Sequence, residues 1–316
     1  MTQLHWTAEQ IPDQSGRTFL VTGANSGLGL ATADALARAG GRVILAVRDE
    51  ERGRRAADRI AAGLPDAALE VRRLDLADLD SVRAFAGRLR ADHTRLDVLV
   101  NNAGVMAPPR QLSAQGHELQ FAVNHLGHFA LTGLLLDLLA AGRDPRVVTV
   151  TSLRHRQGRL RFDDLDGARG YAPMAFYDQS KFAGAVFGRE LHRRLTAAAS
   201  PIRSLLAHPG YTATNLQTNG PIALWRLVFG RILNPLLAQA PERGALPQLY
   251  AATSPDAAGG ELVGPDGRGE LRGGPVRVRL SQAAADPETG RRLWEVSGEL
   301  TDVRYGLPAP SGGPRR

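Results

Sequence analysis

Short apolar segments alternate with longer helical patterns over the first two-thirds of the chain. Buried strands are expected at RTFLVTG, RVILAVR, ALEVRRLDL, LDVLVNNAG, RVVTVTS and IRSLLAHPG, which begin at residues 17, 42, 68, 96, 146 and 202. Between them, segments such as GLATADALARAGG and DEERGRRAADRIAAG have apolar residues at the spacing of helices. This alternation predicts βαβ units and an α/β fold with one doubly wound parallel sheet and helices on both faces.

The alternation weakens after about Tyr211. PIALWRLVFGRILNPLL, residues 221–237, is apolar over a wide helical arc, and we predict a mobile apolar lid at about 211–240. An ordinary core or dimer helix is the alternative. PERGALPQLYAA and DPETGRRLWEVSGELT predict a C-terminal helical extension, and GPDGRGELRGGP predicts turns. We therefore expect an N-terminal arm at 1–15, one domain over 16–305 and a disordered tail at 306–316.

Composition and charge exclude several function classes. The 316 residues carry a net charge of +7, but the arginines are scattered in pairs with acids between them, so nucleic-acid binding is not expected. The chain has no cysteine, which excludes disulfides and thiolate chemistry. FALTGLLLDLLAA contains Asp137 and is too short to span a membrane, and residues 1–16 lack a signal pattern. A soluble, cytoplasmic protein is expected.

A glycine-rich turn follows the first strand and opens a helix. In TGANSGLG, glycines allow a tight turn whose backbone N–H groups can approach a pyrophosphate at the helix N-terminus. A plain strand-to-helix turn is the alternative, but the position after the first strand of a βαβ unit favours a dinucleotide. The candidate residues of this turn are Gly23, Asn25, Ser26, Gly27, Leu28 and Gly29.

The ends of the next strands offer further cofactor contacts. Val47 occupies the place of the acid that usually binds the adenosine ribose, and Arg48 follows it. Because a guanidinium can bind a 2′-phosphate, we predict NADP rather than NAD, although Arg48 could also be a solvated surface arginine. Asp75 and Leu76 end the third strand near the expected adenine, and Asn102, Ala103 and Gly104 of NNAG end the fourth, where a simple turn is the alternative.

Lys181 is the only lysine of the chain, and it follows Tyr177 by four residues on a predicted helix. The two side chains therefore share a face, and a nearby ammonium can lower the pKa of a phenol toward the working range. Ser152 ends the fifth strand and could hold a substrate carbonyl, or could merely initiate a turn. Asn124 lies on an apolar helix, where it could hold a water or be a satisfied core residue. The histidines at 125, 128, 155 and 208 lack carboxylate companions at ligand spacing, so no metal is expected.

Together these motifs resemble the short-chain dehydrogenase/reductase family, which has a Rossmann-type fold. The resemblance covers about residues 15–255. VNHLGHF, HPGYTATNLQ and LWEVSGELT are most similar to the subgroup of retinol dehydrogenases, the WW-domain oxidoreductase and protochlorophyllide reductase.

The resemblance implies hydride transfer between NAD(P) and a small-molecule carbonyl or alcohol, with a bulky apolar substrate expected from the lid. Tyr177 would be the general acid and Lys181 would lower its pKa and bind the nicotinamide ribose. Ser152 would position the carbonyl, Asn124 would hold a relay water, and Pro209, Gly210 and Thr212 would contact the carboxamide. A homo-oligomer is compatible with the sequence. The alternative function is a catalytically inactive NAD(P)-binding sensor or scaffold on the same fold.

Overall fold

The computed structural model describes residues 6–212 and 239–310, so the predicted lid helix at 221–237 lies outside the described residues, as do residues 311–316 of the predicted tail. The strands form one eight-stranded sheet in the order β3-β2-β1-β4-β5-β6-β7-β8, in which only the last pair is antiparallel. Their bounds are β1 Thr18–Thr22, β2 Arg42–Val47, β3 Leu69–Arg73, β4 Val98–Asn101, β5 Arg146–Val150, β6 Arg203–Ala207, β7 Leu262–Pro265 and β8 Pro275–Val278.

Helices connect these strands and follow them. The longer ones are α1 Gly27–Arg38, α2 Glu50–Gly63, α3 Leu79–Asp92, α5 Gly127–Leu134, α7 Pro173–Ala197, α11 Leu246–Thr253 and α13 Pro287–Thr301. The shorter ones are η1 Ala8–Gln10, α4 Leu119–Phe121, η2 Ala122–Leu126, α6 Leu136–Ala140, η3 Leu153–Arg156, α10 Pro241–Gly244, η6 Arg268–Glu270 and α12 Gln282–Ala285. The doubly wound α/β fold predicted from the sequence is thereby confirmed.

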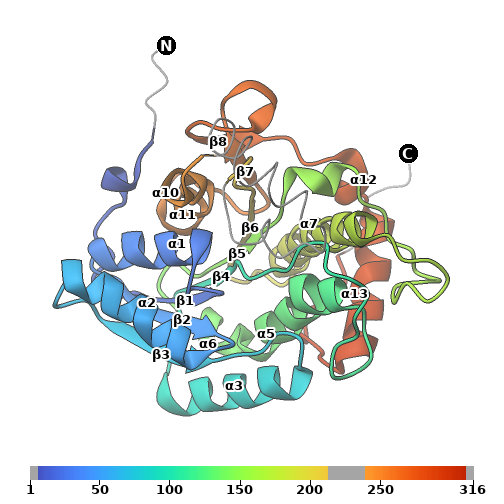
Figure 1. Ribbon diagram of the computed structural model, residues 1–316, viewed down its shortest axis with the longest axis horizontal. Coiled ribbons are helices and arrows are strands. Elements are labelled where there is room, and N and C mark those ends of the chain that lie inside the picture. The colour runs from blue at the N-terminus through green and yellow to red at the C-terminus, as the bar shows by residue number, and fades with distance from the viewer. Residues whose placement is uncertain (1–5, 213–238, 311–316) are drawn as a thin grey trace.

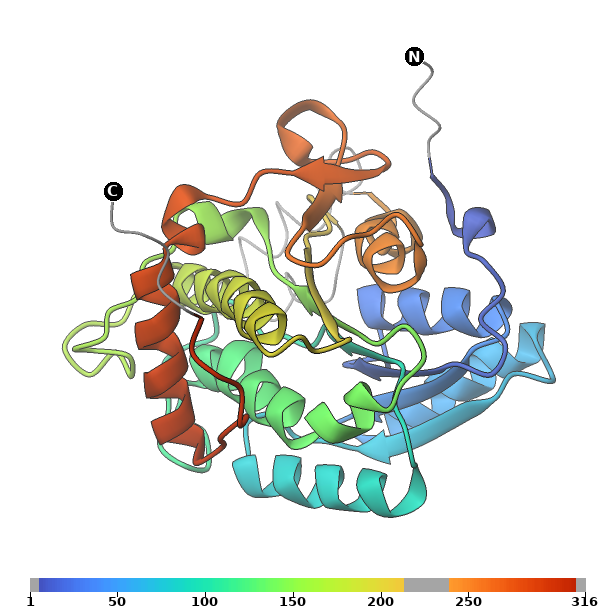
Figure 2. The same cartoon turned by 180° about the vertical axis from the view of Figure 1, so that it is seen from behind.

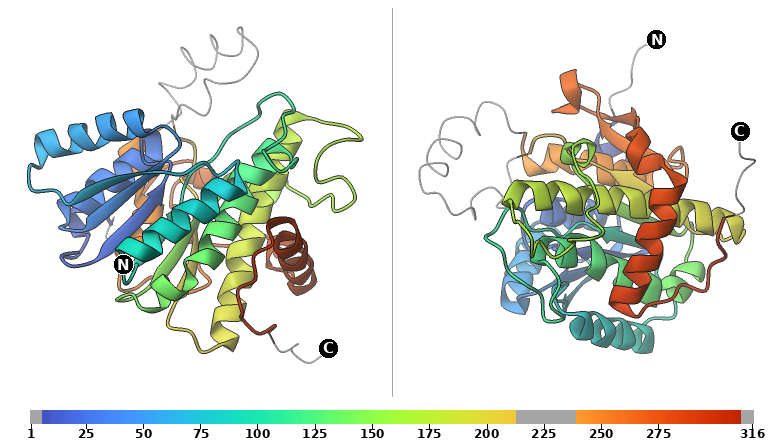
Figure 3. Two further views of the ribbon diagram at one scale, coloured as in Figure 1. Left: turned by 90° about the horizontal axis from the view of Figure 1, so that it is seen from below. Right: turned by 90° about the vertical axis from the view of Figure 1, so that its right-hand side faces the viewer.

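Alternating strand residues supply two cores, one on each face of the sheet. Phe19 and Val21 of β1 pack on the face covered by α1, α2 and α11, whereas Leu20 packs on the face covered by α3, α5 and α7. Successive side chains of a strand point to opposite faces, so a strand buried on both sides is apolar throughout. The view from below shows the two helical layers on either side of the sheet (Figure 1, Figure 3).

The C-terminal helix α13 packs against α7 and α5 rather than against the sheet. Trp294 of α13 meets Phe129, Phe187 and Tyr305 at ring-centroid distances of 5.3, 6.1 and 4.5 Å, and the Tyr305 hydroxyl donates to the Phe129 carbonyl at 2.6 Å. The right-hand view of Figure 3 shows α13 crossing α7. The predicted C-terminal extension is therefore an added layer of the core.

Two strands were not expected from the sequence. β7 and β8 have four residues each and form an antiparallel pair at the end of the sheet, where Leu262 lies opposite Val278. The view from behind shows this pair beside α11 (Figure 2). Segments so short carry too few residues to show an alternating pattern, and the turn-rich sequence between them hides the pairing.

Residues 6–15 of the predicted N-terminal arm run along the outside of this fold. Trp6 packs edge-on against Tyr250 of α11 at 5.5 Å between ring centroids. Within residues 6–212 and 239–310, none of the helices is both long and apolar enough to cross a membrane. The cytoplasmic location stays a prediction.

Candidate functional site

The reversal of strand order between β1 and β4 places the glycine-rich turn at the carboxyl edge of the sheet. Gly23 and Gly27 adopt φ angles of 68° and 53°, which favour glycine. A Cβ at Gly29 would lie 2.3 Å from the Gly23 carbonyl oxygen and 2.6 Å from Asn102 Nδ2. The start of α1 therefore sits directly against the turn, and only glycine permits this approach.

Thr22 fastens the NNAG segment to this turn. Its hydroxyl accepts hydrogen bonds from the backbone N–H groups of Asn102 and Ala103, both at 2.9 Å, and lies 2.9 Å from His128 Nε2. The Asn102 amide donates to the Thr22 carbonyl at 2.8 Å. Two strand ends that lie far apart in sequence thus form one rigid edge.

A cavity of about 350 Å³ opens along this edge. The predicted residues that line it are Gly23, Asn25, Ser26, Gly27, Leu28, Gly29, Arg48, Asp75, Leu76, Asn102, Ala103 and Gly104. Sequence reasoning missed ten further residues that line it: Thr22, Ala46, Asp49, Arg52, Leu74, Val105, Met106, Pro108, Leu119 and Val123. The position of Arg52, four residues after Arg48 in the first turn of α2, was the available signal for that residue.

Asp49, the carboxylate next to Arg48 in the sequence, forms the N-terminal cap of α2. Asp49 caps α2 by accepting a hydrogen bond from the Arg52 backbone N–H at 3.1 Å, and this bond lowers the pKa of Asp49. Its second oxygen lies 3.4 Å from Arg52 Nε. The acid therefore caps the helix N-terminus, and both Asp49 and Arg48 line the cavity.

Asn124 lies in η2, a wide helical turn of a kind that recurs at functional sites. Its amide accepts from the Val105 backbone N–H at 2.8 Å, and donates to the Val105 carbonyl at 2.9 Å and to the Ser180 hydroxyl at 2.8 Å. The side chain thus holds the loop after β4 against α7. Sequence reasoning foresaw a buried amide with partners but could not say which.

Ser152 and Tyr177 meet between η3 and α7. The Ser152 hydroxyl caps η3 and also hydrogen-bonds the Tyr177 phenol, which is buried. Burial raises the pKa of Tyr177 to about 12, and the hydrogen bond from Ser152 opposes this shift. The phenol is therefore protonated at neutral pH.

Lys181 lies beside this pair. Its Nζ is 6.0 Å from the centre of the Tyr177 ring and donates to the Val150 carbonyl at 3.2 Å. Burial lowers the pKa of Lys181 to about 8. Ser152 and Arg154 act to lower the pKa of Tyr177, but burial raises it by more. The net pKa of Tyr177 is therefore raised, not lowered as the sequence predicted. The reason is that desolvation of the phenol outweighs the attraction of nearby positive charge.

Lys181 nevertheless adjoins the cavity. A Cβ at Gly104, which lines the cavity, would lie 3.4 Å from Lys181 Nζ and 3.2 Å from Asn124 Oδ1. Asn124 and Lys181 therefore adjoin the NNAG segment of the cavity wall, and Tyr177 and Ser152 follow next to Lys181, although none of these four predicted catalytic residues lines the cavity itself.

The HPG segment after β6 closes the same edge. Thr212 donates to the Pro209 carbonyl at 2.8 Å, as does Gln239 Nε2 at 2.7 Å. A Cβ at Gly244 would lie 2.4 Å from the Thr212 hydroxyl oxygen and 2.9 Å from Leu28. Thr212 is thereby brought near the glycine-rich turn, although Pro209, Gly210 and Thr212 do not line the cavity.

The short chain dehydrogenase family model matches residues 17–222, a range that includes the glycine-rich turn, Asn124, Ser152 and the Tyr177–Lys181 helix. This chain belongs to the short-chain dehydrogenase family. It is therefore an oxidoreductase of alcohol or carbonyl groups from a family that uses NAD(P).

Similar proteins of known name or structure span nearly the whole chain. Retinol dehydrogenase 13 of Homo sapiens is 40% identical over 310 residues, which cover 94% of this chain and 86% of the relative. Polyprenol dehydrogenase of Mus musculus is 42% identical over 301 residues, covering 94% and 87%. The crystal structure of an uncharacterized protein from Mycobacterium Paratuberculosis is 44% identical, with a TM-score of 0.80, and covers 96% of this chain and all of that one.

The cavity of this short-chain dehydrogenase fits a dinucleotide. The tight approach of α1 to Gly23 places the backbone N–H groups of the helix N-terminus where they would hold a pyrophosphate, and Arg48 and Asp75 lie at the ends of neighbouring strands. Asp75 also accepts a hydrogen bond from the Ala77 backbone N–H at 3.0 Å, which fixes its carboxylate. Among the described residues, no group of three or more His, Asp or Glu side chains could hold a metal ion.

Buried histidines around this site make the fold sensitive to acid. Burial lowers the pKa values of His125 and His128 to about 3 and that of His208 to about 4, below the ordinary 6.5. Each folded pKa is depressed, so the stability contribution is present above pH 6.5 and is lost as the pH falls toward 3. Each histidine should add a slope of about 1.4 kcal/mol per pH unit to the free energy of unfolding in that window.

His125→Phe should remove one of these slopes. We expect the loss of stability between pH 7 and pH 5, measured by urea unfolding, to be smaller by about 2 kcal/mol than in the parent. His125 Nε2 is 2.7 Å from the Ser297 hydroxyl, and the cost of losing this bond applies at both pH values and cancels in the comparison. An unchanged pH dependence would contradict the assignment.

Proposed function

We propose that this chain is an NADP(H)-dependent oxidoreductase that interconverts a bulky apolar carbonyl compound and its alcohol. The observation that carries the proposal is the contact of Asn124 and Lys181 with Gly104 of the cavity wall, together with the Ser152–Tyr177 pair that adjoins Lys181. A protonated phenol next to a second hydroxyl suits proton donation to a carbonyl oxygen held between them.

The catalytic roles follow from these contacts. When bound, NAD(P)H supplies the hydride. Tyr177 donates its phenolic proton to the carbonyl oxygen, and Ser152 donates a hydrogen bond that orients that oxygen. Lys181, whose ammonium lies beside Gly104, would hold the ribose of the cofactor. Asn124 would hold the predicted relay water; its amide is engaged with Val105 and Ser180, and its main-chain carbonyl lies 3.3 Å from His128 Nδ1. Pro209, Gly210 and Thr212 would face the carboxamide.

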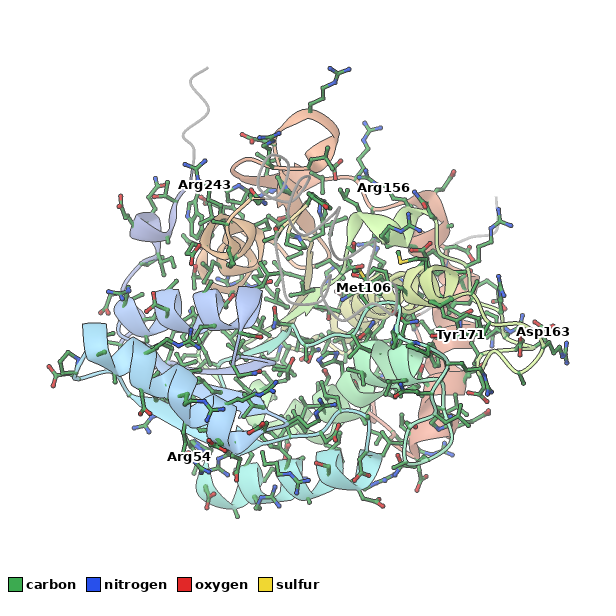
Figure 4. The ribbon with its side chains drawn as sticks, viewed as in Figure 1. Arg54, Met106, Arg156, Asp163, Tyr171 and Arg243 are labelled. Carbon is green, nitrogen blue, oxygen red and sulfur yellow. The ribbon has the colours of Figure 1, made fainter. Side chains whose placement is uncertain are left out.

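A bulky apolar substrate is supported by exposed apolar side chains on the segments next to Tyr177 and Tyr211, and by Met106 in the cavity wall. Met174, one turn before Tyr177 on α7, and Leu271, whose carbonyl accepts from the Tyr211 backbone N–H, are large apolar side chains exposed to solvent. Met106 lines the cavity and lies near the centre of the molecule in Figure 4. Relatives named for retinol and polyprenol fit the same expectation.

NADP preference is proposed from Arg48, because Asp49 is committed to capping α2. Arg48→Asp should remove a partner of the 2′-phosphate and place a carboxylate where it repels that group. We expect the ratio of kcat/KM for NADPH to kcat/KM for NADH to fall about 100-fold, because a charge-assisted hydrogen bond to the 2′-phosphate is lost and the new carboxylate repels that group. Arg54→Asp, on α2 outside the residues that line the cavity and labelled in Figure 4, is the matched control. A parent enzyme that prefers NADH would contradict the assignment.

The test of the function itself is turnover with a panel of carbonyl compounds. NADPH oxidation should be followed with short aldehydes, long aliphatic aldehydes and isoprenoid aldehydes, with the expected order of kcat/KM rising with apolar bulk. The alternative, an inactive NAD(P)-binding sensor or scaffold, predicts NADPH binding by calorimetry without turnover of any of them. If NADPH binds and only small polar carbonyl compounds are turned over, the proposal of an oxidoreductase would stand but the proposed apolar substrate class would be wrong.

A further inference from the structure

Arg154 and Asp178 form a two-point ion pair next to the Ser152–Tyr177 couple. Arg154 Nε donates to Asp178 Oδ1 at 2.6 Å, and its Nη2 donates to Oδ2 at 2.5 Å. Asp178 is buried, whereas Arg154 is about one-third exposed. Parallel bonds of this kind fix both distance and orientation, which a single contact does not.

Arg154 is close in sequence to Ser152, and Asp178 is close in sequence to Tyr177. Arg154 follows Ser152 by two residues in η3, and its backbone N–H donates to the Ser152 hydroxyl at 3.3 Å. Asp178 directly follows Tyr177 on α7. A tether between these two residues therefore constrains the segment that carries each hydroxyl.

Other contacts hold β5 and α7 together on the far side of the couple. The Thr151 hydroxyl donates to the Lys181 carbonyl at 2.8 Å, and Lys181 Nζ donates to the Val150 carbonyl at 3.2 Å. These bonds reach the helix one turn after Tyr177. The Arg154–Asp178 pair reaches α7 at the turn of Tyr177 itself and is an ion pair between charged side chains, whereas the Arg161 backbone N–H reaches the same turn with a single bond to Gln179 Oε1 at 2.9 Å.

We infer that Arg154 and Asp178 are positioning residues for the Ser152–Tyr177 couple: their ion pair sets the separation of the two hydroxyls and balances the charge beside the phenol. The inference rests on the proposed function for the role of that couple.

The charge balance gives the two residues opposite effects on the phenol. The charged groups that act on or lie near the Tyr177 phenol are Arg154 from η3, and Asp178 and Lys181 from α7. Besides the dominant effect of burial, Asp178 raises the pKa of Tyr177 and Arg154 lowers it. Removing one partner leaves the other uncompensated, so the two variants should move the titration of the phenol in opposite directions.

The test compares Arg154→Met, Asp178→Asn and the double variant in the full-length protein. The pH profile of alcohol oxidation has an acid limb where the phenol holds its proton. We expect its midpoint to rise by about half a pH unit in R154M and to fall by a similar amount in D178N, with the double variant between them. We also expect kcat to fall about tenfold in each single variant while the KM for the cofactor stays unchanged, because only the reacting geometry is loosened.

Arg156→Met is the matched control. Arg156 lies in the same short helix and also forms an ion pair, in which its Nη2 donates to both carboxylate oxygens of Glu270 at 2.7 Å. It should leave the midpoint of the acid limb in place. A shift equal to that of R154M, or shifts of the same sign in R154M and D178N, would overturn the inference.

A readout that needs no turnover separates this inference from the proposed function. In protein labelled with ¹³Cζ-tyrosine, the Tyr177 signal is assigned by its loss in Tyr177→Phe and followed as the pH is raised. Opposite displacements of this titration in R154M and D178N support the inference even if no carbonyl compound is reduced. Equal or absent displacements overturn it even if the parent is an active reductase.

Discussion

Tyr177→Phe is expected to lower kcat by about 10³-fold while the affinity for NADPH stays within about twofold of the parent, since only the proton donor is lost. The ring keeps its place in the core, where the side chain is almost wholly buried, and the cavity lining is unchanged. Stopped-flow or steady-state turnover with the best aldehyde of the panel measures the first quantity. Fluorescence titration with NADPH measures the second.

Tyr305→Phe is the control for loss of a buried hydroxyl. Tyr305 donates to the Phe129 carbonyl at 2.6 Å and lies on the face covered by α13, away from the cavity. This variant should lose about 1–2 kcal/mol of stability with kcat unchanged. If Tyr177→Phe kept near-parental turnover, Tyr177 would not be the acid.

Gly29→Ala is expected to weaken NADPH binding by at least about 100-fold, or to prevent a stable fold. The added methyl would lie 2.3 Å from the Gly23 carbonyl oxygen and 2.6 Å from Asn102 Nδ2. Because the Gly23 carbonyl belongs to the backbone and cannot rotate away like a side chain, α1 must move away from the turn. The N–H groups at the start of α1 would then no longer point toward the pyrophosphate. Calorimetric titration with NADPH and a urea unfolding curve distinguish the two outcomes.

Gly87→Ala is the matched control within α3. A Cβ at Gly87 would meet no heavy atom within 4 Å, so this variant should be stabilised by up to about 1 kcal/mol through helix propensity and bind NADPH normally. Parental affinity in Gly29→Ala would show that the turn does not depend on the close approach of α1.

Some features of the site could be read directly from local sequence. A strand followed by TGANSGLG and a helix predicts the phosphate-binding turn, because the glycine conformations and the helix start depend only on neighbouring residues. The spacing of Tyr177 and Lys181 likewise places both on one helical face. All the cofactor-binding residues predicted between Gly23 and Gly104 line the cavity.

Other features depend on partners distant in sequence. The amide of Asn124 reaches Val105 and Ser180, and the Thr22 hydroxyl reaches Asn102, across gaps that no local pattern specifies. The pKa of Tyr177 also shows this dependence. The lysine one turn away in the sequence predicts a lowered pKa, whereas burial in the folded protein raises it. Burial is a property of the packed core and is not visible along the helix alone.

The sequence by itself determined the order of strands and helices through β6, the glycine-rich turn and the identities of the catalytic candidates, because each rests on periodicity or spacing within a few turns. The tertiary structure alone decided the antiparallel β7–β8 pair, the layer formed by α13, and the pairing of Arg154 with Asp178 beside Tyr177. These depend on which segments meet in space, and the free energy that selects such contacts comes from burying surfaces that lie far apart along the chain.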